Sequence, residues 1–329
     1  MVTRSNDVTG MLKVLRERLE QRGAEVLRFD TDRFPTEARV AFAQTAQGEV
    51  LQFRSEGQDL RIEPDDAIWY RRANWAGKLP KDMDPQLRSG CVGESKALLL
   101  GMIAAAPCFV LDPPDLVRQR GHKPAQQRLA RACGLDTPRT LMTNDPEQAR
   151  EFIASCPGGA IAKMLAAFPV IDAQGEEQVV FTTALTERHL AELEGLRFSP
   201  MVFQEKVRKA LELRITVIGS RMFAAAVDSQ STAGAEIDWR ERGVTLLRSW
   251  MPYTLPAEVE RALERYMSAI GMQYSAIDII VEPDGRHVFL EANPAGECWW
   301  LEYNSPHFPL ADALADVLLD VPGARRMAA

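Results

Sequence analysis

The chain has 329 residues, of which 46% are hydrophobic and 26% charged, which is enough for two or three subdomains with a substantial core. Its formal net charge of -7 argues against a protein that binds nucleic acid through a generally basic surface, although it leaves room for a local basic cleft. The five cysteines are widely spaced without a CxxC pair, so we expect reduced thiols. The first ten residues contain no apolar segment, so we expect no signal peptide. Together these features predict a cytoplasmic protein that spans no membrane.

The first part of the chain predicts alternating helices and strands. Residues 11–23 carry apolar side chains at helical spacing, and Gly23 suits the end of a helix. An apolar helix is expected within 97–111, before the double proline at 113–114. Strands are expected over 25–30, 67–72 and 108–114. This alternation is typical of a small α/β domain.

The rest of the chain continues with helices, single strands and two long hairpins. A helix is expected over 123–134, which has proline near its start and glycine at its end. Strands are expected over 138–143, 160–165, 177–185 and 201–207. The hairpins are expected over 212–229 and 276–293, turning at 218–221 and 283–285. Helices are expected over 257–271 and 309–320.

The second hairpin ends in polar residues that buried strands normally avoid. Glu291 and Asn293 close its last strand, although burying an unpaired polar group costs roughly 2–7 kcal/mol. Being two residues apart, they project from one face, which Asp278 shares if the turn places it opposite Phe289. Such oxygen donors suit Mg²⁺, which prefers one or two carboxylates with water and substrate phosphates. The alternative is a solvated sheet end.

Three basic residues elsewhere are candidates for an anion site. Lys163 lies in an apolar strand, where a buried lysine needs a partner such as a phosphate, unless that face of the strand is exposed. Lys123, at a helix start, offers a second phosphate contact or is a surface lysine. Arg240 would clamp a phosphoryl group or a carboxylate, or it is an ordinary surface arginine.

A polar connection between two strands, residues 203–214, is a candidate for nucleotide recognition. Its backbone could meet an adenine edge and Glu212 the ribose hydroxyls, or it is only a charged loop. The sequence contains no Walker P-loop or GxGxxG, and its isolated histidines offer no catalytic triad. A nucleotide site therefore has to be built in another way.

Several stretches, taken in order, resemble the ATP-grasp superfamily. They are Lys163, FQEKV (203–207), ELRITVIG (212–219), AIDIIVEPDG (276–285) and FLEANP (289–294). Over nearly its whole length the chain further resembles the graspetide synthetases, ATP-grasp ligases that cross-link side chains in ribosomally made peptides and include the microviridin-type enzymes. This second resemblance is carried by FDTDRFP (29–35), IWYRR (68–72), DTPRTLMTN (136–144), FQEKV (203–207), DSQ (228–230), DWR (238–240) and FLEANPAGE (289–297).

The resemblance implies an α/β (α+β) ATP-grasp fold in three parts, with ATP held between the last two. The parts would be an N-terminal domain over 1–115, a central subdomain over 116–200 and a C-terminal subdomain over 201–329. The implied Mg²⁺ ligands are Asp278, Glu291 and Asn293. Phosphate contacts would come from Lys123 and Lys163, and adenosine contacts from Glu205, Lys206, Val207 and Glu212. Arg214 and Arg240 would face the reacting phosphoryl and carboxylate groups, and a phosphate-covering loop would lie near 166–177.

The activity implied by the resemblance is that of an ATP-dependent, ADP-forming ligase. It would convert Asp or Glu side chains of a precursor peptide, made of leader and core, into acyl phosphates. Thr or Ser hydroxyls or Lys amines would then attack to give ω-ester or ω-amide macrocycles. A homodimer is expected, with no nucleic acid or membrane as partner.

Two other functions stay open. One is a RimK-like ligase that adds a free amino acid to a peptide or protein. The other is a catalytically inactive protein that binds nucleotide or peptide. Residues 187–198 are either a contact for the leader or an amphipathic helix that packs on its own domain.

Overall fold

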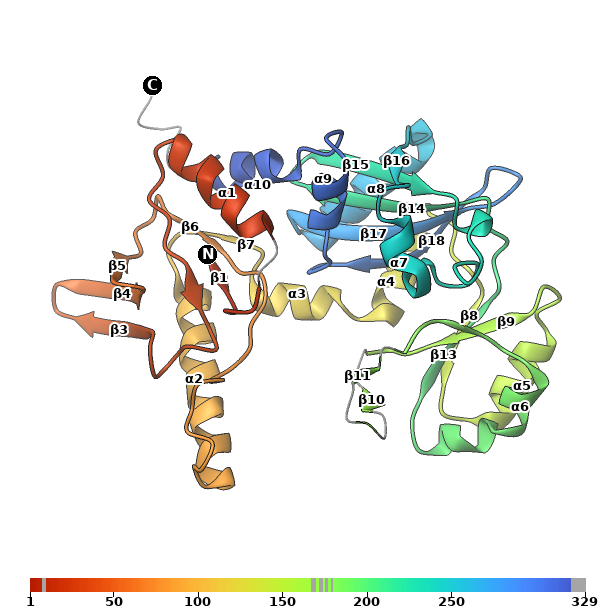
Figure 1. The fold of residues 1–329 in the computed structure, drawn as a ribbon, viewed down its shortest axis with the longest axis horizontal. Helices are drawn as coiled ribbons and strands as arrows, with labels where there is room; N and C mark the ends of the chain where they lie inside the picture. The colour runs from red at the N-terminus through yellow and green to blue at the C-terminus, as the bar shows by residue number, and fades with distance from the viewer. Residues whose placement is uncertain (8–9, 167–169, 172–173, 175–176, 179, 321–329) are drawn as a thin grey trace.

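The computed structural model describes residues 1–7, 10–166, 170–171, 174, 177–178 and 180–320, which form three bodies that each contain β-structure (Figure 1). In the N-terminal body, two parallel strand pairs are joined through a bridge between Val2 and Tyr70. These pairs are β1 (Val2–Thr3) with β2 (Phe29–Asp30), and β6 (Ala67–Trp69) with β7 (Phe109–Leu111). The predicted strands are therefore present but shorter than expected.

Two elements project from this body, as Figure 1 shows. One is the helix α2 (Pro85–Ala105), which starts well before the predicted apolar segment because Asp84 caps it and Pro85 opens it. The other is an antiparallel sheet that the sequence pattern did not predict, made of β3 (Arg39–Thr45), β4 (Gly48–Ser55) and β5 (Gln58–Arg61). The predicted first helix is present as α1 (Gly10–Gln21).

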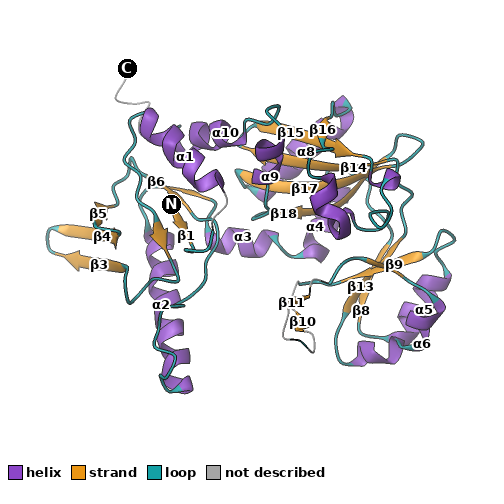
Figure 2. Ribbon diagram, viewed as in Figure 1, coloured by secondary structure: helices purple, strands orange, loops and turns teal. Residues whose placement is uncertain are grey.

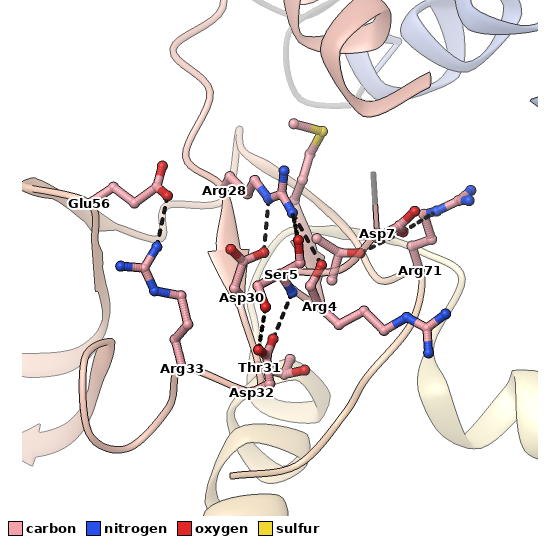
Figure 3. A network of polar contacts seen from close by, with 12 residues as sticks. Arg4, Ser5, Asp7, Arg28, Asp30, Thr31, Asp32, Arg33, Glu56 and Arg71 are labelled. Carbon is pink, nitrogen blue, oxygen red and sulfur yellow. Dashed lines mark hydrogen bonds and ion pairs between the residues drawn. The ribbon is translucent and has the colours of Figure 1, made fainter. Parts of the chain in front are cut away.

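The FDTDRFP stretch lies inside the N-terminal body, and Figure 3 shows its polar contacts. Asp32 accepts hydrogen bonds from the backbone amide and the hydroxyl of Ser5, and Asp30 pairs with Arg28. Both carboxylates are buried. Because their partners belong to the same body, these residues hold the β1–β2 region together and do not reach a ligand cavity.

The central body contains the sheet β12-β9-β13-β8, seen at the lower right of Figure 2. Its strands are β8 (Thr140–Thr143), β9 (Ala160–Lys163), β12 (Thr183–Ala184) and β13 (Met201–Glu205), and β10 (Val170–Ile171) pairs with β11 (Glu177–Gln178) beside them. The helical elements are α5 (Pro146–Ala154), α6 (Glu187–Ala191) and η1 (Leu193–Arg197). Leu193 and Leu196 are buried in this core, so the apolar side of 187–198 packs on its own domain, the second of the two predicted alternatives.

The C-terminal body is built on the antiparallel sheet β16-β15-β14-β17-β18. Its strands are β14 (Leu211–Ile218), β15 (Arg221–Val227), β16 (Met251–Pro252), β17 (Tyr274–Val281) and β18 (His287–Asn293). The two predicted hairpins are present and turn at Gly219 and Gly285, whose positive φ angles suit glycine. Short helical elements follow β15: η2 (Ser229–Ser231), η3 (Trp239–Arg242) and α7 (Gly243–Leu246).

Helices from three parts of the chain cover this sheet. α8 (Ala257–Ile270) and α4 (Lys123–Ala132) share one core with β14, β17 and β18, so α4 packs on the C-terminal sheet rather than on the central one. α10 (Leu310–Leu319), preceded by α9 (Trp299–Asn304), lies against α1 and ties the C-terminal body to the N-terminal one (Figure 1). α3 (Pro114–Arg120) connects the N-terminal body to α4. The domain limits at 115 and 200 remain a prediction.

The register of the second hairpin differs from the one assumed for the metal site. Ile279, not Asp278, lies opposite Phe289, and the ladder then shifts so that Asp278 lies opposite Glu291. Leu290 is the extra residue of this β-bulge. The common face of Asp278, Glu291 and Asn293 is therefore present, but it results from the bulge and not from the assumed pairing.

Two expectations from composition can be compared with the described residues. All five cysteines are free thiols, as their spacing predicted. Within the described ranges, no helix is long and apolar enough to cross a membrane.

Candidate active site

The central and C-terminal sheets enclose one cavity of about 780 Å³ that contains every residue singled out from the sequence. These are Lys123, Lys163, Glu205, Lys206, Val207, Glu212, Arg214, Arg240, Asp278, Glu291 and Asn293. They come from α4, β9, β13 and the connection after it, β14, η3, β17 and β18, so the cavity exists only when both sheets are in place. The structure thus brings the predicted residues together, while their roles toward a ligand stay predictions.

One end of the cavity holds the oxygen donors, each carboxylate paired with a cation. Asp278 accepts two hydrogen bonds from Nη1 of Arg214, at 2.8 and 3.1 Å. Glu291 pairs with the ammonium group of Lys123, which lies at the first residue of α4. The Oδ1 atom of Asn293 accepts from the backbone amide of Ala295 at 3.1 Å.

The electrostatics of this end favour an anionic ligand with its counter-ion. Burial raises the pKa of Asp278, against the opposing effect of Arg214. Burial acts in the same direction on Glu291, but Lys123 and Lys163 outweigh it and lower the pKa of this carboxyl. Burial, together with the neighbouring charge of Lys123, lowers the pKa of Lys163 despite the nearby carboxylates. A polyphosphate would give Lys163 the anionic partner that the sequence analysis required.

The cavity lining also combines apolar side chains with polar groups suited to a nucleoside. Apolar residues from both sheets line it, namely Ile161, Val207, Leu213, Ile280 and Leu290. The amide of Lys206 already donates to the carbonyl of Gly159, so an adenine edge would meet the neighbouring backbone groups. Glu212 is buried and accepts from Lys209 at 2.9 Å, and its burial raises its pKa. Lys209 was not identified from the sequence, because one more lysine in a charged loop carries no signal.

Arg240 is held at the cavity wall by its own motif. Its Nε and Nη2 atoms donate to the two carboxylate oxygens of Asp238, at 2.8 and 2.5 Å. This pairing raises the pKa of Arg240, and Asp238 also caps η3 by accepting from the backbone amide of Arg240. Because Nε and Nη2 already bind Asp238, the clamp hypothesis for DWR stays a prediction.

The wall beyond the oxygen donors includes residues whose role the sequence analysis did not identify. Trp239, Trp250 and Trp300 form an aromatic cluster with ring centroids 5.1–5.3 Å apart. Arg72 of the N-terminal body also lines the cavity, where it pairs with Glu297 at 3.0 Å. The IWYRR and FLEANPAGE stretches contain both partners, but a sequence alone gives no sign that they meet.

The donor set fits Mg²⁺ held together with a nucleotide. Two carboxylates and an amide oxygen on one face are hard ligands, and Mg²⁺ commonly takes its remaining ligands from water and substrate phosphates. Within the described ranges, no three His, Cys, Asp or Glu side chains cluster as a complete protein cage. Of the expected phosphate-covering loop near 166–177, residues 167–169, 172–173 and 175–176 lie outside the described residues.

Comparisons with known proteins give a consistent result. A family model described as the MvdD pre-ATP grasp domain matches residues 1–118, and a search of curated proteins found no match. The chain is 40% identical to the macrocyclase MdnC from Microcystis aeruginosa MRC, solved with precursor peptide MdnA, over 97% of this chain and 98% of that one (TM-score 0.86). It is 31% identical to a RiPP-associated ATP-grasp ligase from Chryseobacterium gregarium, solved with ADP and a leader and core peptide, over 97% and 95% of the two chains (TM-score 0.92). It is 25% identical to the ATP-grasp ligase PsnB, solved with a minimal precursor, Mg and ADP, over 96% and 97% (TM-score 0.72).

Proposed function

The chain belongs to the family of microviridin-type macrocyclases within the ATP-grasp ligases, and on this premise we propose that it cross-links side chains of a ribosomally made precursor peptide. The expected ATP-grasp fold is confirmed by the matches over nearly the full length. The observation that carries the proposal is that hard oxygen donors, paired cations and apolar side chains line the same cavity.

The proposed reaction activates a carboxylate, because hydroxide is too poor a leaving group for direct condensation at neutral pH. A carboxylate oxygen of Asp or Glu in the peptide attacks the γ-phosphorus of ATP, and ADP leaves with the electrons of the broken P–O bond. A Thr or Ser hydroxyl, or a Lys amine, then attacks the acyl carbon. Phosphate departs, the nucleophile loses its proton, and the peptide has lost one water.

In this scheme the protein positions the reactants and balances charge, so no protein nucleophile is needed. Lys123 and Lys163 would contact the phosphates, and Arg214 and Arg240 the carboxylate and the transferring phosphoryl group. Mg²⁺, held by Asp278, Glu291 and Asn293, would supply neutralisation of the phosphate charge.

The ligand-free contacts indicate how this charge balance would change on binding. Lys123 and Arg214 each occupy a carboxylate that the metal needs. ATP would draw Lys123 toward its phosphates as Mg²⁺ takes over Glu291, so nucleotide and metal are expected to bind together. An isolated divalent ion would instead have to displace both cations.

Mass spectrometry of a precursor peptide encoded near the gene tests the proposal. We expect the loss of one water mass for each cross-link, with one ADP formed for each. A mass gain would favour the alternative ligase that adds a free amino acid. An unchanged mass with every such precursor would favour the inactive binding protein, against which the complete set of paired residues in the cavity argues.

We extend the proposal to a homodimer that forms through α2. This helix is apolar on several sides but projects from its body, and its Leu87 and Leu98 are 67% and 43% exposed. Exposed apolar side chains on a long helix are typical of association surfaces. Light scattering of the wild type should give the mass of a dimer, and Leu98→Glu should shift it to the mass of a monomer.

A cytoplasmic location, expected from the free thiols, also belongs to the proposed function.

A further inference from the structure

The catalytic cavity has one wall that comes from the N-terminal body. Arg72 lies just after β6, more than a hundred residues before the cavity residues of the C-terminal sheet, and its side chain lines the same cavity as Asn293 and Arg214. It follows Arg71 in the IWYRR stretch, a motif to which the nucleotide and metal assignments give no role.

Arg71 and Arg72 have different environments. The side chain of Arg71 is only 8% exposed and bridges two carboxylates, Asp7 at 2.6 Å and Glu297 at 2.7 Å. Asp7 is itself buried and accepts the hydroxyl hydrogen of Thr3, and Figure 3 shows its pairing with Arg71. Arg71 therefore fixes the Glu297 carboxylate to the N-terminal body, since breaking a buried pair leaves an uncompensated charge.

Glu297 in turn holds Arg72 at the end of the cavity that contains the oxygen donors. One of its oxygens, Oε2, accepts from both Arg71 and Arg72, the latter at 3.0 Å. The backbone carbonyl of Glu297 accepts from Nη2 of Arg214 at 2.8 Å, and Arg214 pairs with Asp278. Direct contacts thus run from Arg72 through Glu297 and Arg214 to Asp278, which links Arg72 to the oxygen donors.

The guanidinium of Arg72 retains donors for a ligand. Its side chain is 32% exposed, and among the described residues its recorded ion pair is with Glu297 alone. A guanidinium carries five N–H donors in a fixed fork that matches a carboxylate. The aromatic ring of Trp300 lines the same cavity.

From these contacts we infer that Arg72 binds the side-chain carboxylate of the peptide that is to be phosphorylated, with Glu297 and Arg71 as its positioning residues. The inference rests on the proposed function and assigns the peptide end of the cavity to the N-terminal body. Arg72 would then hold the carboxylate beside the oxygen donors, where the proposed phosphoryl transfer takes place.

A double-mutant cycle between enzyme and peptide tests this assignment. The partners are Arg72→Ala and a precursor whose reactive Asp or Glu is changed to Asn or Gln, and binding is measured by calorimetry with MgADP present so that no turnover occurs. Each change alone should weaken peptide binding by about 10- to 100-fold, the usual effect of losing a hydrogen bond to a charged group. Together they should weaken binding no further than the peptide change alone, because that change already removes the contact with Arg72. The affinity for MgADP alone should be unchanged, and Arg72→Lys should restore part of the peptide affinity.

The controls separate binding from folding and from the proposed function. Arg61→Ala removes an exposed arginine of β5 outside the cavity and should leave the dissociation constants of the peptide and of MgADP at their wild-type values. Glu297→Gln alone should weaken peptide binding, but in the Arg72→Ala background it should cause no further loss of peptide affinity. Additive losses in the cycle, or a parallel loss of MgADP affinity, would overturn the inference while wild-type cross-linking still upholds the function. A wild type that cross-links no precursor would overturn both.

Discussion

Gly296 offers a sharp test of how closely the loop after β18 must pack on the metal donors. A Cβ atom added there would lie 2.6 Å from Cβ of Ala276, 3.0 Å from Nη2 of Arg214 and 3.1 Å from Cβ of Asn293. Since carbon atoms pack at about 3.5–4.0 Å, the loop or its neighbours must move by roughly 1 Å. The φ angle of Gly296 is not in the left-handed region, so the effect of Gly296→Ala is steric and not a backbone preference.

Overpacking of this size destabilises a protein by about 1–3 kcal/mol. A shift of about 1 Å in reacting groups can slow catalysis by about 100-fold. We therefore expect Gly296→Ala to retain the fold, with a lowered melting temperature, but to lose about two orders of magnitude in the rate of cross-linking. That rate would be followed by ADP release and peptide mass.

The matched control for this prediction is Gly90→Ala in α2. An added Cβ atom there meets nothing within 4 Å, and α2 does not line the cavity. Gly90→Ala should raise the free energy of unfolding by about 0.5–1 kcal/mol and leave the rate of cross-linking unchanged. A Gly296→Ala enzyme with wild-type turnover would refute the idea that this loop sets the donor geometry.

Three further predictions concern the metal donors and one buried carboxyl. Glu291→Gln and Asn293→Ala should each reduce ADP release by about 100-fold or more while circular dichroism stays unchanged, and wild-type turnover in both would refute the metal assignment. Mg²⁺ alone should give little calorimetric heat because Lys123 already pairs with Glu291, whereas Mg²⁺ with ATP should bind; tight binding of Mg²⁺ alone would contradict this. Burial raises the pKa of Asp112 to about 6. The folded state therefore keeps a proton on this carboxyl that the unfolded chain releases near pH 4, and the free energy of unfolding should fall as pH rises from about 4 to 6. The fall is up to about 3 kcal/mol in urea unfolding, and Asp112→Asn should remove it.

The sequence predicted much of the cavity because its motifs carry chemistry at their own positions. Polar and charged side chains are unexpected in buried strands. Glu291 and Asn293 at the end of one strand, and the lysine inside another, were therefore identified as candidates. The hairpin turns were also predictable, since Gly219 and Gly285 adopt conformations that favour glycine.

What the sequence could not predict depends on contacts between distant segments. Arg72 and Glu297 are separated by more than two hundred residues, and only the packing of two bodies brings them together. The sheet β3-β4-β5 was missed although β4 shows the alternation of a half-buried strand, with Leu51 and Phe53 buried beside Gln52; only β3, most of which is exposed, gives no such signal. The start of α2 was missed because its low-amphipathicity sequence, with glycines inside, weakens the helical pattern.

The bulge at Leu290 explains why the carboxylates meet at all. If the ladder continued regularly beyond the pair of Ile279 and Phe289, Asp278 would lie opposite Leu290, and Glu291 would lie opposite Ile277. Glu291 would then point to the face that packs against α8, where a carboxylate has no partner in an apolar core. One extra residue in the strand therefore moves Glu291 to the cavity face, next to Asp278.

β18 is the edge strand of its sheet, and side chains of α4 pair with its backbone. Gln127 donates to the carbonyl of Leu290 at 2.7 Å, and the side-chain amide of Gln126 both donates to and accepts from the backbone of Ala292. These contacts fix α4 along β18, with the first residue of the helix beside Glu291. The docking of α4 on β18 thus places Lys123 beside the carboxylate that the bulge turns toward the cavity, and the two side chains pair.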